Sequence, residues 1–306
     1  MGSSSSNLAD QKELLYSIAD QRCYINYSPK KTVYEWHLLV DESSYALEKA
    51  KRLRSQYELL YKPRHRLIEF LRQSNTIIKD SVDAFLKGYL NEFVDETVGD
   101  DLRIASENNE PASVLRAYSR SQSFTKKIHS DMAKNTYHQF TLYCTPLNCN
   151  ILARTHDSIQ AFITILFHPK LDCYLCKKDI IVYRGAVVDD ERVLEGYEKN
   201  SIIISTTFLS TSTDPHVAGM FGGCDTDASI SNNILLLCTY KLHNNGRTSL
   251  RMESESNFED EKEILIFPYI PFQIISIKRT QIGPSNRQKV EVEFEEISVD
   301  KIDHQK

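Results

Sequence analysis

The sequence has no apolar run that approaches the ~20 residues a membrane-spanning helix needs. Its longest apolar stretches, 202–204 and 234–238, have only the length of strands. An apolar signal-peptide core is also missing at the N-terminus, so we predict a cytoplasmic protein whose seven cysteines are reduced thiols. Cys173 and Cys176 form one CxxC without a second pair at zinc-binding spacing, so no metal is expected.

An excess of positive charge is equally absent. The net charge is -5 over 306 residues, which gives no reason to expect a nucleic-acid partner. The GxGxxG, Walker and HExxH motifs of common nucleotide and zinc sites are missing as well. The composition, 41% hydrophobic and 26% charged, is that of an ordinary globular protein with a substantial core.

The N-terminus carries the one indication of membrane contact. Met1-Gly2 followed by Ser6 fits the pattern for myristoylation of Gly2, although an unmodified polar tail has the same composition. A single myristoyl chain gives only reversible membrane binding. We therefore expect a membrane as a partner only if Gly2 is acylated.

The first half of the chain has helical periodicity, with apolar residues recurring at spacings of three and four. The predicted helices begin at Glu42 and end at Pro63, run from Ile78 to near Gly99, follow Pro111 with a break at 121–125, and span 157–166 before Pro169.

Beyond Pro169 the pattern changes to strands. We predict strands over 180–183, 201–208, 233–242, 264–267, 272–278 and 288–296. Helices followed by strands favour the α+β class over a wound parallel sheet. We divide the chain into a helical N-terminal region of unknown role, residues 1–110, and a second domain, residues 111–306.

Three polar segments border the predicted strands. Residues 183–185 (Tyr-Arg-Gly) end one strand, 210–212 (Ser-Thr-Ser) end the next, and 261–263 (Glu-Lys-Glu) open a later one. An arginine offers a planar fork for a phosphate, and hydroxyls can orient a carboxylate. Strand alternation would place the two glutamates on one face, ~7 Å apart. Each segment alone is more often a turn, a helix cap or a solvated loop.

In this order, the three segments resemble the arginine-specific, R-S-E class of mono-ADP-ribosyltransferases. That family has an arginine strand, a Ser-Thr-Ser strand and a Glu-x-Glu before an apolar strand, which is 264–268 here. Residues 217–221 resemble its short helix after Ser-Thr-Ser, and 256–259 the loop before its glutamates. The resemblance implies a mixed, split β-sheet core with an NAD cleft, and a catalytic domain over 111–306.

The resemblance also implies how NAD, the co-substrate, is bound. Arg184 would bind the pyrophosphate or a nearby ribose, and the Gly185 backbone would bind the nicotinamide amide. Phe208 or Phe221 would pack near nicotinamide, with core packing as an equal alternative for Phe208.

Catalysis is implied for Glu263, whose carboxylate would stabilise positive charge on the ribose as the glycosidic bond breaks. Ser210 would hold this glutamate in place. Thr211 and Ser212 would support the site and take part in NAD binding.

The implied partner is an acceptor protein with an exposed arginine. Glu261 would bind its guanidinium and assist proton removal, since a protonated guanidinium is a poor nucleophile. Phe258 would contact the acceptor. Glu259 opens a second Glu-x-Glu, but the apolar strand begins directly after Glu263, which favours Glu261 and Glu263.

Three alternatives remain open at this stage. The first is an NAD glycohydrolase, in which water replaces the arginine. The second is a catalytically silent module that binds NAD or a partner on the same fold. The third assigns residues 1–110 a separate interaction role through the basic stretch 49–72, although such a stretch is more often a solvated helix face.

Overall fold

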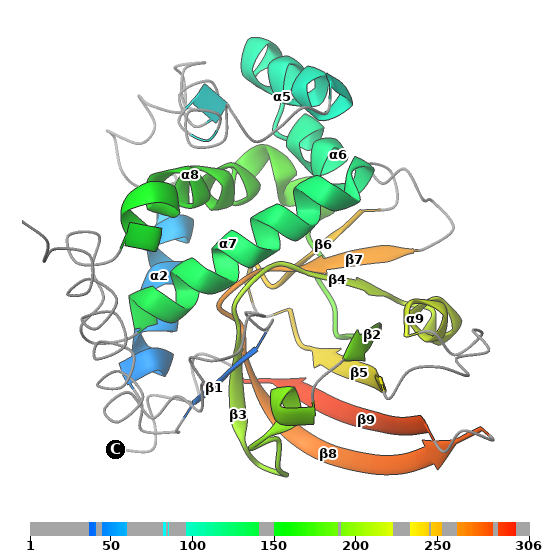
Figure 1. Ribbon diagram of the computed structural model, residues 1–306. Helices are drawn as coiled ribbons and strands as arrows, with labels where there is room; N and C mark the ends of the chain where they lie inside the picture. Colours follow the sequence, from blue (N-terminus) through cyan, green and yellow to red (C-terminus); the bar gives the residue numbers. More distant parts are fainter. Residues whose placement is uncertain are drawn as a thin grey trace, which may run out of the picture.

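A computed structural model describes the greater part of the chain (Figure 1). The described residues are 37–40, 45–59, 82–83, 85, 96–140, 150–188, 191–222, 233–244, 246–252, 262–283 and 287–297.

Most of the described helices gather on one side of the molecule (Figure 1). They are α2 (Tyr45–Leu59), α5 (Glu96–Asn108), α6 (Ala112–Arg120), α7 (Gln122–Phe140) and α8 (Asn150–Leu166). Two 3-10 turns, η1 (Pro169–Tyr174) and η2 (Glu191–Leu194), are also described. None of the helices among the described residues is long and apolar enough to cross a membrane.

The strands follow mainly in the second half of the chain, which confirms the predicted α+β class. They are β1 (His37–Val40), β2 (Ile180–Val188), β3 (Ile202–Ser205), β4 (Leu209–Ser212), β5 (Ile234–Leu242), β6 (Ser249–Arg251), β7 (Glu263–Ile266), β8 (Pro271–Ile282) and β9 (Arg287–Glu296). One further helix, α9 (Pro215–Phe221), lies apart from the other labelled helices, against β2 and β4.

The nine strands form a mixed sheet that is nearly divided in two. Their order is β1-β3-β8-β9-β5-β2-β4-β7-β6, with β5 and β9 parallel and the other pairs antiparallel. β2 pairs with β5 along its full length, but it meets β4 only where Tyr183 lies opposite Ser212. This single contact separates six strands from three and confirms the predicted split sheet.

Residues before 110 take part in this sheet. β1 pairs with β3, and Leu38 and Val40 belong to the hydrophobic core that also contains the C-terminal strands. The buried ring of His37 lies between two tyrosine hydroxyls, 2.9 Å from Tyr197 Oη and 3.0 Å from Tyr240 Oη. A role for residues 1–110 distinct from that of 111–306 stays a prediction.

Two helix boundaries differ from the prediction. α5 continues through Gly99, because Val98, Leu102 and Ala105 bury one face at helical spacing and outweigh the ~1 kcal/mol cost of an internal glycine. α8 begins at Asn150 rather than 157. The break between α6 and α7 lies at Ser121, whose extended backbone ends one helix and whose Oγ accepts a bond from Phe124 N.

The predicted strand 201–208 ends earlier than expected, because β3 ends at Ser205 and a separate strand, β4, begins at Leu209. β3 pairs with β8 in the larger part of the sheet, and β4 pairs with β7 in the smaller part. The chain crosses between them at Thr206 to Phe208. Phe208 is fully buried there, with its ring 5.6 Å from that of Phe267, so core packing is the interpretation that the structure supports for this residue.

Candidate active site

Three strands beside the division of the sheet bring the predicted polar residues together. Arg184 lies on β2, Ser210 on β4, and Glu263 is the first residue of β7. Ser212 lies opposite both Tyr183 and Glu263 in the strand pairing. The register of β2, β4 and β7 therefore fixes the relative positions of the backbone atoms that carry the Arg184, Ser210 and Glu263 side chains.

Two hydrogen bonds connect the three residues. Arg184 Nη1 donates to the Ser210 carbonyl at 2.6 Å, and Ser210 Oγ donates to Glu263 Oε1 at 2.5 Å. Glu263 is only 6% exposed, and a buried carboxylate is stabilised by accepting such a bond. Arg184, Ser210 and Glu263 thus form one connected cluster.

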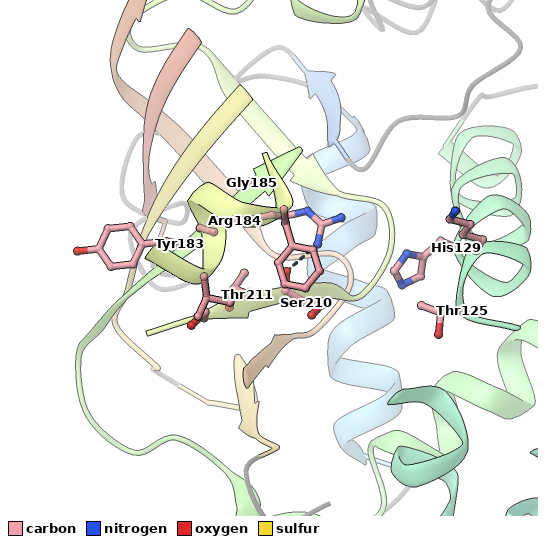
Figure 2. Close-up of a pocket in the computed structure, with 12 residues that line it drawn as sticks. Thr125, His129, Tyr183, Arg184, Gly185, Ser210 and Thr211 are labelled. Atoms are coloured by element: carbon pink, nitrogen blue, oxygen red, sulfur yellow. Dashed lines mark hydrogen bonds between the residues drawn. The ribbon is translucent and has the colours of Figure 1, made fainter. Parts of the chain in front are cut away.

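Arg184 and Ser210 line a pocket of about 270 Å³, whereas Glu263 is not among its lining residues and is connected to it through Ser210. Figure 2 shows Arg184, Gly185 and Ser210 on one side of it, and Thr125 and His129 projecting towards them from α7. The lining residues are Thr125, Lys126, His129, Tyr183, Arg184, Gly185, Ser210, Thr211, Ser212, Val217, Ala218 and Phe221.

Arg184 and Gly185 lie inside β2, which continues to Val188, so the predicted strand end at 183–185 is wrong. Helix α9 explains why glycine is needed here. A Cβ on Gly185 would lie 1.8 Å from the Ala218 carbonyl oxygen and 2.6 Å from Gly222 N. Close packing of α9 on β2 therefore requires the glycine independently of any ligand.

The other two hydroxyls of Ser-Thr-Ser bond to the backbone. Thr211 Oγ1 donates to the Ile264 carbonyl at 2.6 Å, and Ser212 Oγ accepts from Asp214 N at 2.9 Å. The first bond ties β4 to β7. The second shapes the turn into α9, whose N-cap is Asp214. Both residues line the pocket and stabilise its wall.

Glu261, Glu259 and Phe258 lie outside the described residues. The backbone of Lys262 has φ 48°, so the chain is not extended just before β7. That Glu261 and Glu263 share one face stays a prediction, since Glu261 is not among the described residues. Phe221 is described: it lines the pocket and is 60% exposed.

No motif in the sequence predicts the helix side of the pocket. Thr125, Lys126 and His129 come from α7, where polar residues one turn apart are the only signal. Behind them, the Tyr118 hydroxyl of α6 lies 2.5 Å from His129 Nε2. Helix packing, rather than a short sequence pattern, brings this pair together.

Burial and the Arg184 guanidinium control the charges on this side. Burial first, and Arg184 second, lower the pKa of His129 to about 3. Burial raises the pKa of Tyr118, the Glu263 carboxylate raises it further, and Arg184 opposes both. At neutral pH, His129 is uncharged and Tyr118 is protonated beside a charged arginine.

No protein-family model matches the sequence, and a search of curated proteins gives no match. Solved structures do show similar folds. Exoenzyme S from Pseudomonas aeruginosa, in complex with human 14-3-3 protein beta and bound to carba-NAD, is 14% identical over 71% of this chain and 88% of its own, with a TM-score of 0.42.

Two ADP-ribosyltransferases are similar to a comparable degree. One from Clostridium botulinum is 14% identical over 68% of this chain and 98% of its own, with a TM-score of 0.41. The Vis toxin from Vibrio splendidus is 19% identical over 81% and 94%, with a TM-score of 0.33. At these identities and TM-scores, the similarity assigns neither an activity nor a residue's role to this chain.

Proposed function

We propose that this protein cleaves NAD and transfers the ADP-ribose to arginine side chains of acceptor proteins. The observation that carries the proposal is the connected cluster of Arg184, Ser210 and Glu263, in which Arg184 and Ser210 line one pocket and Ser210 donates a hydrogen bond to Glu263. Cleavage of an N-glycosidic bond needs a carboxylate held beside the sugar and a cation for the phosphates. The cluster supplies both.

The pocket suits one end of a dinucleotide. Its volume of about 270 Å³ is close to the ~300 Å³ lower limit of small-molecule pockets. Arg184 and Lys126 line it and offer two cations to a pyrophosphate. We assign the Gly185 backbone to the nicotinamide amide and Phe221, at the rim, to an apolar contact with the nicotinamide ring.

When bound, NAD supplies a ribose carbon whose bond to nicotinamide breaks, with the electron pair leaving on the nicotinamide nitrogen. Glu263 would accept a hydrogen bond from the ribose 2′-hydroxyl and stabilise the positive charge that develops on the ring. Ser210 would keep the carboxylate aimed at the ribose.

Glu261 is assigned to the acceptor, with Phe258 as an apolar contact. A guanidine nitrogen of the acceptor bonds to the ribose carbon and releases one proton, which Glu261 would take as general base. The products are nicotinamide, ADP-ribosyl-arginine and a proton.

The test is nicotinamide release from NAD together with transfer of labelled ADP-ribose to agmatine, a small guanidine acceptor. Glu263→Gln keeps the size of the side chain and removes its charge. It is expected to reduce both activities by ~100- to 1,000-fold, the usual effect of removing a group that stabilises transition-state charge. A wild-type protein that releases no nicotinamide would show that the chain is a silent module.

Glu261→Gln tests the acceptor. We expect it to reduce transfer to agmatine at least ~100-fold, because a general base is lost, and to leave NAD hydrolysis within about twofold. Glu259→Gln is the matched control. Equal loss of both activities in Glu261→Gln would contradict its acceptor role, and a transfer defect in Glu259→Gln instead would shift the register by two residues.

A further inference from the structure

Tyr118 lies in the core, and its hydrogen-bond partner His129 lines the pocket. Tyr118 is 2% exposed, and its ring centroid lies 6.3 Å from those of Phe162 and Phe208. Thr125 Oγ1 donates to the Tyr118 carbonyl at 2.5 Å and ties α7 to this residue. The tyrosine is therefore held by the core, and its hydroxyl supports the half-buried ring of His129.

The proton in this hydrogen bond can be assigned by accounting for donors and acceptors. His129 is neutral and Tyr118 protonated, as their pKa directions require. Among the described residues, His129 is the only hydrogen-bond partner of the Tyr118 hydroxyl. If His129 Nε2 carried the ring proton, the buried hydroxyl would have no acceptor for its own, which is unfavourable. Tyr118 therefore donates to Nε2, and the ring proton is on Nδ1.

We propose that Tyr118 is a positioning residue that fixes His129 in its Nδ1–H tautomer, so that the ring presents one uncharged donor to an oxygen acceptor of the bound ligand. Within the described part of the chain, Nδ1 has no other hydrogen-bond partner. The identity of the ligand as NAD rests on the proposed function. Its ribose hydroxyls and its amide carbonyl are acceptors of the required kind.

The surroundings explain why an uncharged donor is useful here. Arg184 from β2 and Lys126 from α7 are cations that line the same pocket, and Glu263 from β7 acts electrostatically on Tyr118. A protonated His129 would be repelled by Arg184 and would add a third cation beside a developing positive charge. A neutral imidazole adds a directed hydrogen bond without charge.

The tautomer is measured directly on the full chain labelled with 15N-histidine, using long-range 1H–15N correlation spectra of the imidazole. We expect His129 to show the Nδ1–H pattern without change between about pH 5 and 8, where an ordinary histidine titrates. Tyr118→Phe keeps the ring and removes the hydroxyl, so it is expected to shift His129 towards the Nε2–H form. An Nε2–H tautomer in the wild type, or an unchanged tautomer in Tyr118→Phe, would overturn the positioning role.

The ligand contact is tested with two amides that imitate one ring nitrogen each. His129→Asn places its amide N–H near the Nδ1 position, whereas His129→Gln reaches the Nε2 position beside Tyr118. We expect the KM for NAD to rise about five- to tenfold in His129→Gln, as for loss of one neutral hydrogen bond, and to rise by a smaller factor in His129→Asn, which keeps a donor near the Nδ1 position.

Equal KM values in the two variants would overturn the ligand contact. Circular dichroism of each variant checks that it is folded. If the wild type neither binds nor cleaves NAD, the proposed function and the NAD contact fail together. The spectra recorded without ligand still decide whether Tyr118 sets the tautomer.

Discussion

The two walls of the pocket are built in different ways. The strand wall comprises Arg184, Gly185 and residues 210–212, which main-chain pairing of β2, β4 and β7 holds in register. The helix wall comprises Thr125, Lys126 and His129, which depend on how α7 packs against α6 and the aromatic core. Backbone pairing leaves the side chains of the strand wall little freedom to move. On the helix wall, substitution of a single side chain can change the hydrogen-bonding groups that face the pocket.

The walls also differ in charge. The strand wall contains the Arg184 guanidinium and leads through Ser210 to the Glu263 carboxylate. The helix wall presents a neutral imidazole next to the exposed Lys126. Variants on the strand wall should therefore alter the rate of bond cleavage most, and variants on the helix wall should alter ligand affinity.

Among the variants that compare the two walls, Ser210→Ala on the strand wall is expected to have the largest effect. Its hydroxyl donates to a buried carboxylate, and a hydrogen bond to a charged group contributes ~1.5–3 kcal/mol. We expect kcat for nicotinamide release to fall ~10- to 100-fold while KM changes little. Ser201→Ala is a matched control, since that hydroxyl bonds to the Gly196 carbonyl and does not line the pocket. Equal activity of the two variants would show that Ser210 does not position Glu263.

Gly185→Ala tests how rigid the strand wall is. The new Cβ would meet the Ala218 carbonyl oxygen at 1.8 Å, and backbone atoms cannot give way as a flexible side chain can. Overpacking of this kind costs ~1–3 kcal/mol, so we expect a lower free energy of unfolding in urea. A variant as stable as the wild type would mean that α9 moves freely over β2.

The contrast between the walls also explains which site residues can be predicted from the sequence. Arg184, Ser210 and Glu263 stand in short segments next to apolar strands, so a local pattern finds them. The same pattern misplaces the end of β2, because pairing with β5 extends that strand through Gly185 to Val188. His129 and Tyr118 lie 11 residues apart on two helices, and only the packed core brings their side chains together. No local pattern encodes such a contact.

Two histidines with lowered pKa values, one outside the pocket and one on the helix wall, give a pH test. His37 on β1 and His129 each have a pKa lowered to about 3, by burial first and then by Arg184. An unfolded histidine titrates near ~6.5, so the unfolded chain binds more protons below that pH and stability falls as pH falls towards 3. Each histidine contributes a slope of ~1.4 kcal/mol per pH unit in this window.

His37→Leu removes one of these groups. We expect the variant to be less stable at pH 7, since Tyr197 and Tyr240 lose their partner, and to lose ~1.4 kcal/mol per pH unit of the slope between about pH 4 and 6. Urea unfolding at several pH values measures both quantities. An unchanged slope would show that His37 is protonated in the folded protein.

The smallest effect is expected at Gly99, and its sign is opposite to that at Gly185. Gly99 lies in the interior of α5, and a Cβ there would meet no atom within 4 Å. Gly99→Ala should therefore stabilise the protein by ~0.5–1 kcal/mol through lower backbone entropy in the unfolded chain. The midpoint of thermal unfolding should rise by ~1–4 °C. A loss of stability would mean that α5 is packed around Gly99 as tightly as α9 is packed on Gly185. The difference in packing between the helices and the strand wall would then not hold outside the pocket.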